Sequence, residues 1–206
     1  MKEQVIEALG LLRRAAEKRP DDLSIKEKLL GAYLRAGLFD EAVEEFFSLV
    51  HRKPDWPQVH FETLGRQAGR TSTELHAAFE RAAADQPNNA LAWYGLGFMQ
   101  QLMGDQRAAD AAFRRGISAN PSFAPLHYNL GVALMDYPDQ AARHLHQATT
   151  LSSAMAEPHY ALATIYMTQD RVKAVYHYER FIRLAPPYLQ GYIEQAQASL
   201  QLLGRS

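Results

Sequence analysis

The chain has 206 residues, 47% of them hydrophobic, which is enough to bury a continuous core, and it contains no cysteine. The lack of cysteine excludes disulfides and thiolate-bound metal sites. Lysine and arginine (22) balance aspartate and glutamate (23) without a basic cluster, so we expect no nucleic-acid partner.

A repeated pattern of prolines divides the chain into units of nearly constant length. Pro20, Pro54, Pro87, Pro121 and Pro186 are 34, 33, 34 and 65 residues apart, and the last interval hides one more unit in which Ser153 replaces the proline. A triplet centred on a large side chain precedes each of these positions, and its spacing of four and three residues predicts a buried helical stripe. The triplets are Ala8, Leu12, Ala15; Ala42, Phe46, Leu49; Leu75, Phe79, Ala82; Ala109, Phe113, Gly116; Ala141, Leu145, Ala148; and Ala174, Tyr178, Phe181.

This period predicts an all-α solenoid of antiparallel helix pairs. Residues 1–22 form a helix that resembles the second helix of a pair, and we expect Val5, Ile6 and Leu9 to cover its open end, either by folding back or by packing on another copy of the chain. Residues 23–56, 90–123, 124–155 and 156–188 predict helix pairs. Residues 57–89 predict an irregular pair, in which Phe61, Leu64 and Gly65 carry the first stripe one position late. Residues 189–206 predict an amphipathic capping helix.

Helix stops and starts mark the turns inside these pairs. They are Gly37 and Asp40, Gly69 and Thr71, Gly104 and Asp105, and Pro138 and Asp139. Thr71 and Glu74 also form a predicted capping box at the start of a helix. Because the period is unbroken, we expect residues 1–206 to form a single domain.

One stretch resembles the signature of the tetratricopeptide repeat (TPR) family. It contains Trp93, Leu96, Gly97, Ala109, Phe113 and Pro121. Residues 23–54 are similar through Leu29, Tyr33, Ala42, Phe46 and Pro54, although Lys26 occupies the usual bulky place. The resemblance covers nearly the whole chain and implies a right-handed superhelix, whose first helices line a concave groove that binds peptides or partner helices.

The offset of the first helices assigns a set of residues to this groove. They are Tyr94, Phe98, Gln101, Tyr128, Asn129, Val132, Met135, Tyr160, Thr164 and Met167. Few of them are charged, so we expect a protein or peptide partner with an apolar or extended segment, whose backbone Asn129 would bind. The family's clamp for a C-terminal carboxylate is mostly absent, because Glu27, Gly31, Glu157 and Ala161 occupy places where clamp residues would be needed.

The residues that could carry chemistry have simpler structural explanations. His127 and His159 occupy the position of Trp93, so we expect them to pack between helices. His144 and His146 point to nearly opposite helix faces and cannot chelate one ion, whereas His51, His60, His76 and His177 are scattered. Gly95 and Gly97 lie inside a predicted helix and do not form a dinucleotide motif. We expect no catalytic residue, metal or cofactor, and therefore no enzyme.

Two alternatives to a free-standing scaffold stay open. The chain could be the recognition or regulatory domain of a larger enzyme, or a self-assembling scaffold that forms a homo-oligomer through the N-terminal helix. No stretch is long and apolar enough to predict membrane insertion, and residues 1–14 do not form a leader, so we expect a cytoplasmic protein.

Overall fold

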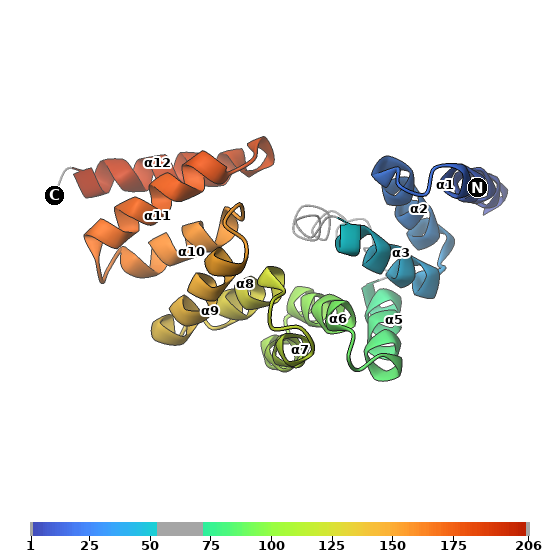
Figure 1. The fold of residues 1–206 in the computed structure, drawn as a ribbon, viewed down its shortest axis with the longest axis horizontal. Helices are drawn as coiled ribbons and strands as arrows, with labels where there is room; N and C mark the ends of the chain where they lie inside the picture. Colours follow the sequence, from blue (N-terminus) through green and yellow to red (C-terminus); the bar gives the residue numbers. More distant parts are fainter. Residues whose placement is uncertain (1, 53–71, 205–206) are drawn as a thin grey trace. The chain divides into compact units, whose positions relative to one another are not determined.

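A computed structural model describes residues 2–52 and 72–204, and within these ranges every regular element is a helix (Figure 1). The all-α solenoid class predicted from the repeats is therefore confirmed. The predictions for Phe61, Leu64, Gly65, Gly69 and Thr71 lie outside the described residues. The chain falls into two compact units, residues 1–120 and 121–206, and the expectation of a single domain stays a prediction.

The first unit contains helix pairs whose members follow each other along the chain. Its helices are α1 (Lys2–Lys18), α2 (Leu23–Ala36), α3 (Phe39–Arg52), α5 (Ser72–Asp85), α6 (Ala90–Leu102) and α7 (Gln106–Ala119). Helix α2 packs on α3 and α6 packs on α7, while α5 contacts both α3 and α6. Helix α1 packs on α2.

The second unit repeats the same arrangement. Its elements are α8 (Ala124–Ala133), α9 (Pro138–Leu151), α10 (Glu157–Tyr166), α11 (Arg171–Leu184), the 3-10 turn η2 (Pro187–Leu189) and α12 (Gln190–Gly204). The pairs are α8 with α9 and α10 with α11, and α12 packs on α11. Ala196 and Leu203 of α12 are buried in this contact.

The turns inside the pairs form where the sequence places them. Gly37 and Gly104 follow α2 and α6 with φ angles of 75° and 83°, a left-handed conformation that glycine adopts without steric cost. The Asp105 carboxylate then caps α7 by accepting a hydrogen bond from the backbone N–H of Ala108 at 3.0 Å. Pro138 is the first residue of α9, where its missing N–H costs no helical hydrogen bond.

Close approach of the two helices in a pair explains the small residues of the first stripe. A Cβ atom at Gly97 would lie 2.6 Å from the Phe113 ring, and one at Gly131 would lie 2.7 Å from Leu145 Cγ. Phe113 and Leu145 are fully buried. The glycine of each of these first helices therefore makes room for the large residue at the centre of the second-helix triplet.

Helix α1 departs from the predicted stripe. Ala8 is exposed and Leu12 and Ala15 are only half-buried, whereas Leu9 is buried with 6% of its surface exposed. The triplet prediction is therefore wrong for α1, because α1 packs on α2 and Leu9, rather than the triplet, is its buried residue. Leu9 is covered as expected, but Ile6 is 67% exposed.

In the pairs α2/α3, α6/α7, α8/α9 and α10/α11, one residue in the first turn of the first helix contacts the second helix. We call its place the first-turn position. It is occupied by Lys26, Trp93, His127 and His159. The Trp93 indole N–H donates to the Pro87 carbonyl at 2.7 Å, and His127 Nε2 lies 3.0 Å from the Pro121 carbonyl. The proline of one repeat thus supplies the acceptor for the ring of the next.

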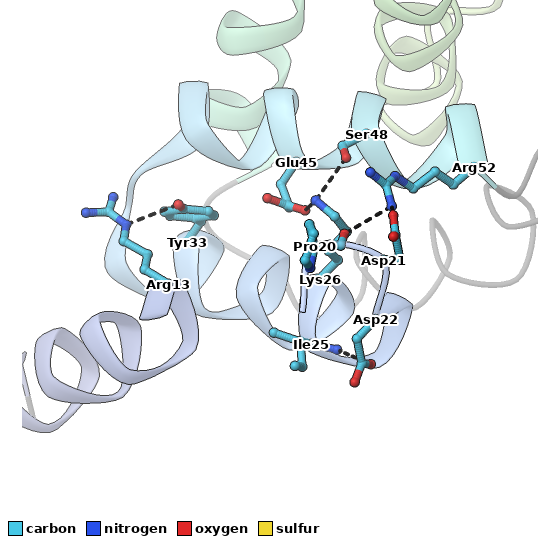
Figure 2. Close-up of polar contacts among 10 residues, drawn as sticks. All are labelled: Arg13, Pro20, Asp21, Asp22, Ile25, Lys26, Tyr33, Glu45, Ser48 and Arg52. Atoms are coloured by element: carbon cyan, nitrogen blue, oxygen red, sulfur yellow. Dashed lines mark hydrogen bonds and ion pairs between the residues drawn. The ribbon is translucent and has the colours of Figure 1, made fainter. Parts of the chain in front are cut away.

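Lys26, at the same position of α2, contacts the second helix through its charged ammonium group. Its ammonium group lies 2.9 Å from a Glu45 carboxylate oxygen and 3.0 Å from the Ser48 hydroxyl (Figure 2). The Pro20 carbonyl accepts a hydrogen bond from Arg52 instead of from the first-turn residue. Arg52 also forms an ion pair with the Asp21 carboxylate. Lys26 is therefore a partly buried member of an ion pair and does not interrupt the repeat.

The histidines at the first-turn position form pairs across the helices. Because the Pro121 carbonyl can only accept, His127 Nε2 carries the proton, and His127 Nδ1 then accepts from His144 Nδ1 at 3.3 Å. His159 Nδ1 and His177 Nδ1 are 2.8 Å apart and both residues are buried, so one ring donates and the other accepts. The structural role expected for His127 and His159 is confirmed, whereas His177 is not scattered as predicted.

Burial keeps the second pair neutral. It lowers the pKa of His159 and of His177 from 6.5 to about 4, and the neighbouring Arg180, Lys173 and His146 act in the same direction. No acid contributes to either shift. Protonating both rings would also place two N–H donors face to face across 2.8 Å.

Gly97→Ala should destabilise the chain by about 1–3 kcal/mol, because the added methyl group overpacks the contact with the Phe113 ring. Gly191→Ala in α12 is the matched control, since a Cβ there meets nothing within 4 Å. The control should be neutral or gain about 0.5–1 kcal/mol from helix propensity. Urea unfolding followed by circular dichroism measures both, and equal stability of the two variants would contradict the packing explanation.

The free energy of unfolding should fall as the pH drops from 7 to 5. Histidines in the unfolded chain take up protons near their ordinary pKa of 6.5, whereas folded His159 and His177 resist protonation until about pH 4. One such histidine accounts for about 2 kcal/mol over this interval. Urea titrations of the double variant His159→Asn/His177→Asn should show a flatter pH dependence, with His51→Asn at the exposed end of α3 as control. An unchanged slope in the double variant would refute the assignment.

Candidate functional site

The sequence-predicted groove residues of the second unit lie on α8 and α10, which are in contact, except that Met135 is in the turn after α8 and Met167 is the C-cap of α10. We call their shared side the first-helix face, which comprises Tyr128, Val132, Met135, Tyr160, Thr164 and Met167. Tyr128 and Val132 are four residues apart on α8, as are Tyr160 and Thr164 on α10, so each of these two pairs shares one side of its helix. Thr164 and Met167 are exposed, and the other four are half-buried.

The two helices that carry this face are almost free of charge. Helix α8 contains no charged residue, and α10 contains only Glu157 in its first turn. The Thr164 hydroxyl donates to the Tyr160 carbonyl of its own helix at 3.1 Å. The Met167 sulfur accepts a hydrogen bond from the Tyr178 hydroxyl at 3.1 Å while 37% of the residue stays exposed. The face therefore offers aromatic, aliphatic and thioether surface without competing ions.

Tyr160 also joins three helices of the second unit. Its ring packs edge-on against Phe181 at 5.1 Å and Tyr192 at 5.2 Å, and its hydroxyl donates to Gln195 Oε1 at 2.8 Å. Burial raises the pKa of Tyr160, and Tyr178 and Tyr192 add to the effect. Tyr192 and Gln195 were not predicted from the sequence, although their place on the terminal helix after the last pair could have indicated them.

Two of the predicted groove residues are not available to a partner. Tyr94 is fully buried, with its ring stacked on Phe46 at 6.4 Å, because α6 is covered on this side by α3 and α5. Asn129 is only 5% exposed, and its side-chain amide donates to the Pro125 carbonyl at 2.8 Å. The prediction that Asn129 binds a peptide backbone is therefore wrong for this structure, as is the exposure of Tyr94.

Phe98 and Gln101 belong to α6 in the first unit and are half-buried. The Phe98 ring packs on Tyr94 with the ring centres 6.5 Å apart. That Phe98 and Gln101 form one groove with the residues of the second unit stays a prediction.

The first unit contains a cavity of about 590 Å³ that was not predicted from the sequence. Lys26 and Tyr33 of α2, six residues of α3 and residues at the end of α5 line it. The α3 residues are Asp40, Glu41, Val43, Glu44, Glu45 and Ser48, and the others are Ala78, Arg81, Ala82, Asp85 and Gln86. The adjacent acids Glu44 and Glu45 were the available signal, but acids on a helix surface are usually just solvated.

The described part of the chain offers no metal centre. Residues 2–52 and 72–204 contain no group of three histidine, cysteine, aspartate or glutamate side chains arranged to hold an ion. His144 and His146 turn toward different neighbours, His127 and Tyr166 respectively, which agrees with their predicted opposite directions. In the same ranges, no helix combines the length and apolarity needed to span a bilayer.

Comparison with known proteins supports the repeat assignment. A family model described as Tetratricopeptide repeat matches residues 2–62. Human Tetratricopeptide repeat protein 8 is 36% identical over 85 residues, which is 40% of this chain and 16% of that protein. The chain thus spans about a sixth of the length of this relative.

Two solved structures share the fold at low sequence identity. One is the APC/C hetero-tetramer Cut9-Hcn1, with a TM-score of 0.58 and 17% identity, covering 94% of this chain and 40% of that chain. Another is the MamA protein, with a TM-score of 0.53 and 18% identity, covering 79% of this chain and 91% of that chain. The repeated signature, the helix pairs and the family match over residues 2–62 together support a tetratricopeptide repeat assignment.

Proposed function

We propose that this protein is a noncatalytic scaffold that holds an apolar or extended segment of a partner protein on the first-helix face. The tetratricopeptide fold is in general a scaffold for protein–protein interaction. One solved structure of this fold, Cut9-Hcn1, is a hetero-tetramer. A binding role therefore fits the tetratricopeptide repeat fold.

The observation that carries the proposal is the uncharged surface of α8 and α10. Val132, Met135 and Met167 are only partly buried inside the unit, so part of their apolar surface stays in contact with water. Covering such surface releases water and stabilises a complex by roughly 25 cal/mol per Å². Thioether side chains also adapt their shape to different partners. These properties favour an apolar segment over a highly charged one.

Thr164→Arg should abolish partner binding while leaving the fold intact, because an exposed threonine is replaced by a bulky cation in the centre of the face. Thr150→Arg is a closely matched control. Thr150 is also exposed, and its hydroxyl donates to the carbonyl of the residue four positions earlier, as the Thr164 hydroxyl does, but it lies on the second helix α9. The two variants thus differ in the face that carries the new charge.

Affinity capture from the native extract with quantitative mass spectrometry compares the wild type and both variants. Genuine partners should be retained by the wild type and by Thr150→Arg, and be depleted about tenfold or more by Thr164→Arg, since an unpaired charge would be buried in the complex. Circular dichroism confirms that both variants fold. Equal recovery by the two variants would refute the first-helix face as the binding surface.

A second candidate function is self-association through α1. This helix exposes Ile6 and Leu11 to 67% and 59%, and such apolar side chains are commonly covered in an interface. The exposure of Ile6 favours packing on another copy over folding back.

Light scattering should then show a mass above 23.2 kDa that rises with protein concentration. Ile6→Glu/Leu11→Glu should return the mass to 23.2 kDa by placing two like charges in the interface. Ile6→Ala/Leu11→Ala should give an intermediate effect. A wild-type mass of 23.2 kDa at every concentration would exclude this function.

A further inference from the structure

We infer that the cavity of the first unit is a second binding site, which takes an arginine- or lysine-bearing segment of a partner protein. The inference rests on the proposed scaffold function, but it concerns a different surface and a different partner chemistry from the first-helix face. The site lies between α3 and α5, with α2 contributing Lys26 and Tyr33.

The charges that line the cavity are unequal. Five carboxylates, from Asp40, Glu41, Glu44, Glu45 and Asp85, stand against the two cations of Lys26 and Arg81. Both cations are already engaged. Lys26 pairs with Glu45 at 2.9 Å, and Arg81 pairs with Asp40 at 2.6 Å.

Three of the five lining carboxylates are not paired with Lys26 or Arg81. Among residues 2–52 and 72–204, Glu41, Glu44 and Asp85 form no ion pair, and Glu44 accepts only a long 3.4 Å hydrogen bond from the Gln86 amide. All three are exposed, so a ligand can approach their carboxylates from solvent. The cavity lining therefore carries more carboxylates than cations, around a space large enough for side chains of a bound segment.

The chain already binds one guanidinium group at the edge of this site. Arg13 donates from Nε to the Tyr33 hydroxyl at 3.1 Å, and its guanidinium carbon lies 5.2 Å from the centre of the Tyr33 ring (Figure 2). The hydrogen bond raises the pKa of Arg13, and the charge of Glu41 acts in the same direction. Tyr33 and Glu41 both line the cavity, so two of its lining residues interact favourably with a guanidinium group of the chain itself.

The remaining lining suits the long stems of basic side chains. Ala82 contributes partly exposed apolar surface beside the carboxylates, whereas Val43 and Ala78 are buried beneath them. Lysine and arginine bury their methylene groups on such surface while their charged ends reach polar groups. A metal ion fits less well, because the described residues hold no group of three possible ligands with suitable geometry. Nucleic acid phosphates would be repelled by the same carboxylates.

A fluorescent peptide of alternating arginine and alanine is the probe, and fluorescence anisotropy with the full chain is the measurement. The control peptide replaces each arginine by citrulline, which keeps the shape and removes the charge. The arginine peptide should bind saturably, and the citrulline peptide should bind at least about tenfold more weakly. Affinity should also fall when salt is raised from about 0.05 M to about 0.3 M, because exposed charges are screened.

A pair of double variants separates the cavity from general attraction to an acidic surface. Glu41→Gln/Glu44→Gln removes two cavity charges, and Glu17→Gln/Glu80→Gln removes two exposed charges that do not line the cavity. The net charge changes equally in both. The cavity variant should bind the arginine peptide about fivefold to tenfold more weakly. The control variant should stay within about twofold of the wild type.

Three outcomes would overturn the inference: no binding of the arginine peptide, equal binding of the citrulline peptide, or equal weakening by the two double variants. Circular dichroism and thermal melting establish that the variants fold. Thr164→Arg, which lies in the second unit, should bind the arginine peptide as the wild type does. Failure of the first-helix face and failure of the cavity are therefore distinguishable.

Discussion

The packing of this protein depends on the close approach of the two helices within each pair. Phe113 and Leu145 reach the core only because Gly97 and Gly131 leave the space that a Cβ atom would fill. In these two pairs, a small residue on the first helix is therefore a steric requirement for the large residue on the second helix. The requirement recurs at a nearly fixed sequence distance, which produces the repeat period.

Once this contact is satisfied, the first-turn position can vary. Trp93 uses its indole N–H, His127 and His159 use partner histidines, and Lys26 uses an ion pair with Glu45. Each choice gives a polar side chain a partner at the junction of the two helices, where an unpaired group would destabilise the fold. The choice also affects the expected pH dependence of stability, because the lowered pKa values of the buried His159 and His177 should make the fold less stable in acid.

The same packing determines which surfaces stay available for binding. Tyr94 is on the side of α6 that α3 and α5 cover, and Asn129 is held by its own helix through Pro125. What is left is chemically different in the two units. The second unit presents apolar side chains on nearly uncharged helices, whereas the first unit presents a cavity rich in carboxylates. A scaffold with two unlike surfaces can distinguish partner segments by their chemistry.

The sequence by itself determined the helix pairs, the turns at Gly37 and Gly104, and the buried large residues of the triplets from Phe46 onward, because these follow from local spacing and backbone preferences. That the first-helix face of the second unit binds a partner stays a prediction. The sequence could not determine that Tyr94 is covered, that His177 pairs with His159, or that α3 and α5 enclose a cavity. These facts depend on the distances between residues of different helices, and only the tertiary structure determines those distances.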